Sequence, residues 1–263
     1  ELLLNDHMIG LDGGRQAEVD HMGRELQILG DPVPSVPGKN IYLNLDVRLQ
    51  NVADEAMRGQ SGAVLIMNPK TGEILGLASY PDFDPNLFSG GIDQGNWNIL
   101  LENPEHPLEN KSIQGLYAPG SIFKVVTAYS GLEQSAMSPE DEYFCNGEFY
   151  VKGRTDPYKC WKEGGHGRVN LLNAIKGSCN VYFYNIGMGV GVDQMHKYAR
   201  MFGLGKITGI GLLNEKEGII PSSKWKQRVY NEPWYEGETP TMAIGQGFII
   251  VTPLQVLNMI NIL

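Results

Sequence analysis

The sequence predicts an α+β protein, in the wider α/β class, whose antiparallel sheet is flanked by helices. Two apolar runs over residues 62–80, joined by a turn that contains Pro and Gly, indicate a β-hairpin. Apolar side chains that recur with a helical period after Gly120 indicate a helix buried on one face. The chain has 263 residues, 42% hydrophobic and 19% charged, which is enough for one large core with an appendage.

The composition argues against two classes of protein. A net charge of −9 disfavours nucleic-acid binding, because phosphate backbones are bound by basic surfaces. No run of about eighteen apolar residues is present, so the sequence predicts no membrane span. The first residues also lack the basic segment and apolar core of a signal peptide, although the mature part of an exported or anchored protein would look the same.

The N-terminal part is rich in Gly, Asp and Pro and predicts a turn-rich extension with short strands at 17–19 and 26–29. Three prolines in residues 31–38 predict a linker, because proline interrupts both strand pairing and helices. The alternation over residues 41–45 then predicts a strand. Residues 46–58 predict a helix with the Asp at position 46 as its N-cap.

Beyond the hairpin, residues 81–110 predict a long polar and aromatic loop, and residues 225–234 predict an exposed loop with aromatic and basic side chains. Four later segments have the apolar spacing of helices. They are residues 169–176, 180–188, 192–201 and 253–263, the last with Thr252 as its cap.

The segment QGLYAPGSIFKVVTA, residues 114–128, predicts a reactive serine. Ser121 lies in the first turn of the predicted helix and Lys124 lies three positions later, so the hydroxyl and the amine are neighbours. An amine shielded from water loses proton affinity and can take the proton of an attacking serine. S-x-x-K alone recurs by chance, and a capping serine beside a solvated lysine is the alternative. Two observations favour the reactive serine over the capping one. Apolar residues surround the motif, and the triplet Ser178-Cys179-Asn180 is predicted in the connection between two helices.

Four phrases resemble the transpeptidase domain of class B penicillin-binding proteins, of the elongation type called penicillin-binding protein 2. They are MNPKTGEILGLASYPDFDPN, NKSIQGLYAPGSIFK, GHGRVNLLNAIKGSCNVYFYNIG and AIGQGFIIVTPLQ, in the family's order. The resemblance implies the penicillin-binding transpeptidase fold over residues 41–263, after a pedestal remnant and linker at 1–40. The family's K-T-G-T strand is expected after the helix that begins near Thr252, beyond this chain. The K-T-G at 70–72 precedes the serine and predicts an ordinary turn.

The resemblance also implies an activity, peptidoglycan D,D-transpeptidation during cell elongation. Ser121 would attack the penultimate D-alanine carbonyl of a stem pentapeptide, with Lys124 as its base. Ser178 would relay a proton towards the leaving D-alanine, Asn180 would hold Lys124 or the donor amide, and the Ser121 backbone N–H would donate to the oxyanion. Implied partners are β-lactam antibiotics, a glycan polymerase and other elongation-complex membrane proteins. The implied location is the periplasmic face of the bacterial inner membrane, with an N-terminal anchor helix that this chain does not contain.

Two other functions share the serine and the lysine. A serine β-lactamase would need a base that activates water, and no E-x-x-x-N element of the class A type follows Ser178. A non-catalytic β-lactam sensor would also hold a stable acyl group, and a scaffold would merely bind partners in wall synthesis.

The three cysteines and one histidine form a second pattern, Cys145-x14-Cys160-x5-His166-x12-Cys179. Three thiolates and an imidazole are the ligands of a closed, structural zinc site. Two alternatives stay open: a Cys145–Cys160 disulfide with Cys179 as an apolar filler, or three unlinked thiols. With zinc bound, Cys179 would point away from the groove and hold its neighbours Ser178 and Asn180 in working geometry.

Overall fold

The computed structural model describes residues 2–263, which form two compact units. The smaller unit contains the residues up to Asn44 together with Gly209–Leu213. The larger unit contains Leu45–Thr208 and Asn214–Leu263. No helix in the described part of the chain combines the length and the apolar character that a bilayer crossing requires.

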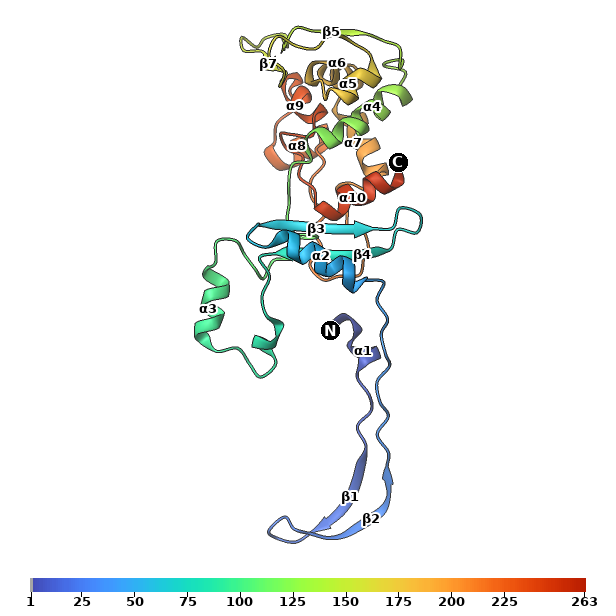
Figure 1. The fold of residues 1–263 in the computed structure, drawn as a ribbon, viewed down its shortest axis with the longest axis vertical. Coiled ribbons are helices and arrows are strands. Elements are labelled where there is room, and N and C mark those ends of the chain that lie inside the picture. The colour runs from blue at the N-terminus through green and yellow to red at the C-terminus, as the bar shows by residue number, and fades with distance from the viewer. Residues whose placement is uncertain (1) are drawn as a thin grey trace. The chain divides into compact units, whose positions relative to one another are not determined.

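The smaller unit is built on a two-stranded antiparallel ribbon, β1 (Gly14–Val19) with β2 (Glu25–Val33), preceded by η1 (Leu2–Leu4) and α1 (Asn5–Met8) (Figure 1). Both strands are longer than predicted. The prediction that residues 31–38 are a linker is wrong at its start, because Pro32 lies inside β2. The pairing register shifts next to this stretch and the residues around Pro32 are exposed, so the N–H that proline lacks is not needed there.

The predicted hairpin of the larger unit is confirmed as β3 (Gly62–Met67) and β4 (Ile74–Tyr80), with Leu65 opposite Leu77. Helix α2 (Val47–Met57) packs against both strands. Asp46 is its predicted cap and accepts a hydrogen bond from the Arg48 N–H. The K-T-G copy lies in the hairpin turn, where Gly72 has φ +74°. It therefore has the turn role that its position predicts.

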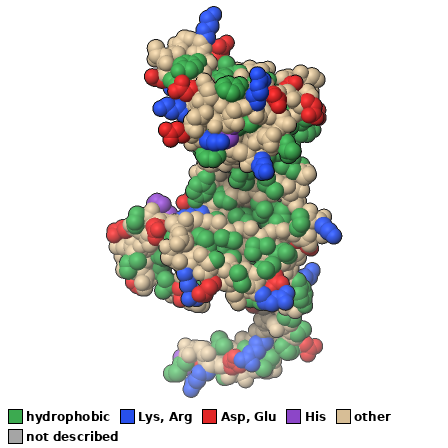
Figure 2. All heavy atoms as spheres, turned by 45° about the horizontal axis from the view of Figure 1, so that its top comes forward, with side chains coloured by type: hydrophobic (Ala, Val, Ile, Leu, Met, Phe, Trp, Pro, Cys, Tyr) green, Lys and Arg blue, Asp and Glu red, His purple; other side chains and the backbone are tan. Residues whose placement is uncertain are grey.

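Two predictions before and after the hairpin are wrong. No strand forms at residues 41–45, where Tyr42 is 88% exposed and no described strand pairs with it. The predicted loop at 81–110 contains η2 (Pro85–Phe88) and α3 (Gln94–Glu102), which begin where Asp84 and Asp93 cap free N–H groups. Helix α3 has no buried residue. Figure 2 shows many hydrophobic side chains exposed between charged ones on the face of the molecule in view.

The core lies among helices that gather around α6 (Asn180–Val190) (Figure 1). Seven of its residues are buried, because this helix is apolar on nearly every side. The helices that pack against α6 are α4 (Lys124–Glu133), α5 (Leu171–Lys176), α7 (Val192–Met201) and α9 (Thr239–Ala243). Helix α10 (Pro253–Ile262), capped by Thr252 as predicted, contacts β3.

Short strands and one unpredicted helix complete the larger unit. Strand β5 (Tyr143–Cys145) pairs with β8 (Gly167–Val169), and β6 (Glu148–Phe149) pairs with β7 (Tyr158–Lys159). The exposed loop predicted at 225–234 is wrong, because α8 (Ser223–Tyr230) occupies its first part and η4 (Glu236–Glu238) follows. Ser222 caps α8 and Asn231 ends it in the left-handed conformation.

Candidate active site and metal-ligand cluster

Ser121 and Lys124 lie at the N-terminal end of α4. Ser121 is exposed in η3 (Gly120–Phe123), the turn that leads into the helix. Lys124 is the first residue of α4 and is only 3% exposed. The structure thus has an accessible hydroxyl and a buried amine within one turn, as the spacing predicts.

The backbone that leads to Ser121 is closely packed. The Gly120 N–H donates to the Gly245 carbonyl oxygen over 2.9 Å. Gly245 has φ +73°, and a Cβ built there would lie 2.2 Å from the Gly120 carbonyl oxygen. Only glycine can occupy this position without displacing the backbone in front of Ser121. Sequence reasoning missed Gly245, although it lies in the AIGQG phrase that carries the resemblance.

The predicted triplet lies in the connection between α5 and α6. Ser178 has φ +50°, a left-handed conformation that non-glycine residues rarely adopt, and Asn180 is the first residue of α6. Cys179 between them is fully buried. Such strain is found at functional sites, where the surrounding structure holds it in place.

Hydrogen bonds join the four predicted residues into one chain. The Lys124 Nζ donates to the Ser178 carbonyl oxygen and to Ser178 Oγ, both over 2.8 Å, and to Asn180 Oδ1 over 2.7 Å. Ser178 Oγ donates to Ser121 Oγ over 2.9 Å. The Ser178 hydroxyl therefore bridges the Lys124 amine and the Ser121 hydroxyl, which the spacing of Ser121 and Lys124 alone did not predict.

The environment of Lys124 suits a base. Burial lowers the pKa of its amine to about 8, and the charges of the nearby Cys160 and Cys179 sulfurs oppose this shift. The Phe183 ring also packs near Nζ, at 5.7 Å. An amine with this pKa is partly neutral near pH 8 and can accept a proton.

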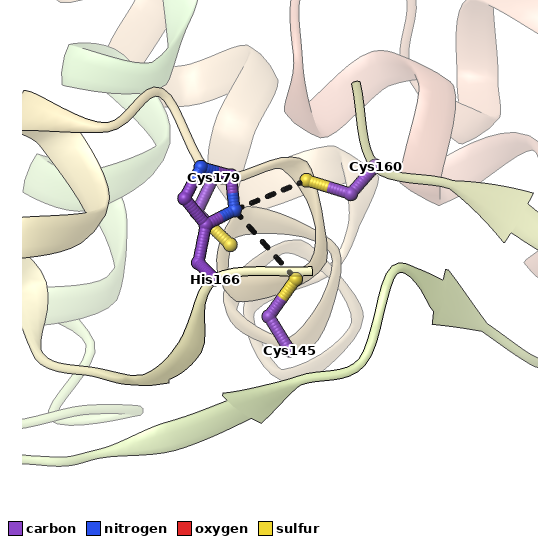
Figure 3. Close-up of side chains that lie close together, drawn as sticks. All are labelled: Cys145, Cys160, His166 and Cys179. Atoms are coloured by element: carbon purple, nitrogen blue, oxygen red, sulfur yellow. Dashed lines mark hydrogen bonds between the residues drawn. The ribbon is translucent and has the colours of Figure 1, made fainter. Parts of the chain in front are cut away.

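Cys145, Cys160, His166 and Cys179 converge on one another, as Figure 3 shows. Their ligand atoms all lie within 4.8 Å of one another. The His166 Nδ1 is 3.8 Å from Cys145 Sγ and 3.5 Å from Cys160 Sγ. A tetrahedral zinc with usual bond lengths would separate a sulfur and a nitrogen by about 3.6 Å. The cluster therefore fits an ion of that size.

The hydrogen bond of His166 also fits a metal ligand. Its Nε2 lies 3.1 Å from the Gly177 carbonyl oxygen, and because a carbonyl only accepts, Nε2 carries the proton. This tautomer leaves the Nδ1 lone pair facing the three sulfurs, and a carbonyl that accepts from the other ring nitrogen commonly orients a metal-ligating imidazole in this way. No disulfide joins the three cysteines, all of which lie in the described part of the chain.

The loop that carries Cys160 also contacts the Ser178-Cys179-Asn180 triplet. The Trp161 Nε1 donates to the carbonyl oxygens of Gly177 and Ser178, both over 3.1 Å. The Lys159 carbonyl oxygen accepts from Asn180 Nδ2 over 3.3 Å. Sequence reasoning missed Trp161 and Lys159, since nothing in the polar loop except the adjacent cysteine marks them.

A cavity of about 610 Å³ in the larger unit is not at this site. It lies between α7 and α8 and none of the four predicted catalytic residues lines it. A smaller apolar groove of about 390 Å³ lies beside the turn that carries Ser121, lined by Pro119 and Ile122 together with Leu65 of β3 and residues of α10.

Comparisons with known proteins agree with the geometry. The family model described as penicillin binding protein transpeptidase domain matches residues 62–263. The peptidoglycan D,D-transpeptidase MrdA of Escherichia coli K12 is 36% identical over 263 residues, 100% of this chain and 41% of that protein. The enzyme of the same name from Acinetobacter baumannii is 40% identical over 250 residues, 95% of this chain and 37% of that protein.

Solved structures agree as well. Penicillin-binding protein 2 of Pseudomonas aeruginosa, solved in complex with WCK 5153, has a TM-score of 0.84 at 35% identity and is matched over 88% of this chain and 50% of that one. The Helicobacter pylori protein in complex with MreC has a TM-score of 0.88 at 35% identity, over 97% of this chain and 47% of that one. This chain spans about two fifths of the length of the curated relatives it matches. It belongs to the penicillin-binding protein transpeptidase family, with the fold of that family, and is of the penicillin-binding protein 2 type.

Proposed function

We propose that this chain carries the serine acyltransferase site of a peptidoglycan D,D-transpeptidase that cross-links stem peptides during cell elongation. The observation that supports this most strongly is the hydrogen-bonded chain from Lys124 through Ser178 to Ser121. Family membership supports it independently, because the MrdA relatives are named for this activity.

The first half-reaction acylates Ser121. With Lys124 neutral, the contacts of Ser178 can reverse, so that the Ser121 proton passes to Ser178 Oγ and the Ser178 proton passes to Lys124 Nζ. Ser121 Oγ forms an ester bond to the penultimate D-alanine carbonyl carbon, and the amide bond to the terminal D-alanine breaks. The relayed proton goes to the leaving amine.

The second half-reaction releases the enzyme. An amine of a neighbouring stem peptide attacks the ester, an amide cross-link forms, and Ser121 recovers its proton through Ser178. Asn180 keeps Lys124 in place by accepting from Nζ over 2.7 Å. A β-lactam would follow the first half-reaction alone and stay bound to Ser121.

The proposed setting follows from the same family. The protein would act at the periplasmic face of the bacterial inner membrane, on lipid-linked stem peptides, together with a glycan polymerase and other elongation-complex membrane proteins. The Helicobacter pylori relative, solved with MreC, supports the proposal of elongation-complex partners.

Penicillin labelling of the full-length protein tests the acyl-enzyme. We expect a fluorescent penicillin to label the protein, to stay bound for many minutes, and to be lost in Ser121→Ala but not in the control Ser61→Ala, whose residue is exposed outside the site. Rapid release of the label would identify a β-lactamase. A stable label without cross-linking of lipid-linked donor and acceptor would identify a sensor or scaffold.

We also propose that Cys145, Cys160, His166 and Cys179 hold one structural zinc. Three thiolates and one imidazole would close its coordination sphere, so zinc would supply rigidity and no Lewis-acid step. Through Cys179 the zinc would hold Ser178 and Asn180 in place. Through Cys160 it would hold the adjacent Trp161, whose side chain donates to the Ser178 carbonyl.

Metal analysis tests the zinc proposal without relying on activity. We expect about one zinc per chain in protein made without added metal, lost in His166→Gln but kept in the control His196→Gln. Penicillin acylation should slow in the variant that lost the ion. A metal-free protein with only one titratable thiol would show the Cys145–Cys160 disulfide instead, and a metal-free protein with three thiols and full acylation would remove the proposal altogether.

A further inference from the structure

Lys226 is a buried cation that the proposed reaction does not use. It lies on α8 and is 3% exposed, although it belongs to a residue type that is almost never fully buried without a partner. Its Nζ pairs with the Glu238 carboxylate and lies 3.7 Å from Glu232. Aromatic rings of Tyr235, Phe248 and Trp234 surround it, with centroids 4.5, 5.6 and 6.0 Å from Nζ. An ammonium enclosed in this way holds the Glu238 carboxylate in place, and with it the groups that bond to that carboxylate.

Glu238 organises the segment that follows. Its second carboxylate oxygen accepts the Tyr235 N–H over 3.0 Å, which closes the cap of η4. Its carbonyl oxygen accepts from Thr241 Oγ1 over 2.9 Å. The Thr241 carbonyl in turn accepts the Gln246 N–H over 2.9 Å, just after α9. The ion pair is therefore linked through short, local hydrogen bonds to the residue after Gly245.

Gly245 carries this link to the nucleophile. Its carbonyl oxygen accepts the Gly120 N–H over 2.9 Å, and its own N–H is held by the Met242 carbonyl over 2.9 Å. The approach is so close that a Cβ on Gly245 would meet the Gly120 oxygen at 2.2 Å and the Phe123 Cβ at 2.6 Å. A displacement of Gly245 therefore moves Gly120, the residue that precedes Ser121.

We propose that Lys226 is a positioning residue, which holds Ser121 in place through Glu238 and Gly245. It touches no substrate and acts only by fixing the backbone behind the serine. The effect on catalysis rests on the proposed transpeptidase function, whereas the positioning of Gly120 does not.

Hydrogen exchange at the Gly120 amide measures the positioning directly. Pro119, the preceding residue, has no backbone N–H and therefore adds no exchange signal of its own. In Lys226→Met we expect exchange about tenfold faster, because local opening of the Gly120–Gly245 bond becomes easier. Lys226→Arg, which keeps the charge, should restore part of the protection. Lys224→Met is the matched control, an exposed lysine on the same helix, and should leave exchange unchanged.

The result that overturns the inference is unchanged Gly120 exchange in folded Lys226→Met, or the same increase in Lys224→Met. If Lys226→Met does not fold, Glu238→Gln replaces it, because this variant removes the partner's charge and keeps the side-chain volume. Faster Gly120 exchange in Glu238→Gln supports the inference, and unchanged exchange overturns it.

Penicillin acylation of the full-length protein tests the catalytic consequence. We expect the first-order acylation step to slow about tenfold in Lys226→Met while the dissociation constant of the initial complex stays the same. A merely structural role would reduce the amount of active protein and leave that rate constant intact, which would overturn the catalytic part. If unaltered protein takes up no penicillin, the proposed function fails, and the exchange comparison still decides the positioning.

Discussion

In the proposed mechanism one amine, that of Lys124, serves as the base. Burial lowers the pKa of Lys124 to about 8 from its usual 10.5, so the amine is mostly charged at pH 7 and mostly neutral at pH 9. Only the neutral form can take a proton from Ser178. The ordinary lysine pKa would leave almost no base at physiological pH.

A pH profile should show this amine. Since the reactive form is deprotonated, penicillin acylation should rise with pH, about tenfold between pH 7 and pH 9, and level off above the pKa. Stopped-flow acylation kinetics on the full-length protein provide the profile, and Lys124→Arg should be inactive throughout. A flat profile between pH 6 and pH 10 in the unaltered protein would show that Lys124 is not the base.

Among the helices, the N-terminal ends of α4 and α6 position Lys124 and Asn180, and capping side chains stabilise helix ends. Thr252 is buried and accepts the Gln255 N–H over 3.2 Å at the start of α10, which contacts β3. We expect Thr252→Ala to lower the free energy of unfolding by about 1 kcal/mol, and Thr252→Ser to keep most of it. Urea unfolding measures both. Equal losses in the two variants would assign the effect to the threonine methyl group and not to the cap.

The predictable elements are those whose signals are local. The apolar period predicted α6 and α7, Asp46 and Thr252 predicted their helix starts, and the Pro- and Gly-containing turn predicted the β3–β4 hairpin. Helix α8 was missed because its first turns carry charged and aromatic residues without a helical apolar period. Its buried Lys226 pairs with Glu238, which is twelve residues away in sequence, so this contact cannot be recognised from periodicity.

The same reason limits the prediction of the site. Motifs identified Ser121, Lys124, Ser178 and Asn180, and ligand chemistry identified the four metal-ligand candidates. Three hydrogen bonds of the site join residues more than fifteen positions apart. They are the bonds from Ser178 Oγ to Ser121 Oγ, from Trp161 Nε1 to the Ser178 carbonyl, and from the Gly120 N–H to the Gly245 carbonyl. Contacts of that kind depend on the packing of whole helices, which no short motif contains.

In the whole molecule, one unit carries every group discussed above. The larger unit contains the hydrogen bonds from Lys124 through Ser178 to Ser121, the cysteine and histidine cluster, and the Lys226 network. Burial of α6 at its centre holds α4, α5 and α9 together, and with them the two ends of the hydrogen-bonded chain. The core is thus the scaffold that brings a serine, a lysine and a serine–asparagine pair into contact.

In the proposed mechanism Ser121 is the nucleophile, and the position of a β-lactam adduct tests this assignment. Full-length protein treated with a β-lactam should be digested and the adduct located by mass spectrometry. We expect one adduct, on the peptide that contains Ser121, and none in Ser121→Ala. An adduct on any other residue, or one that persists in Ser121→Ala, would show that Ser121 is not the nucleophile.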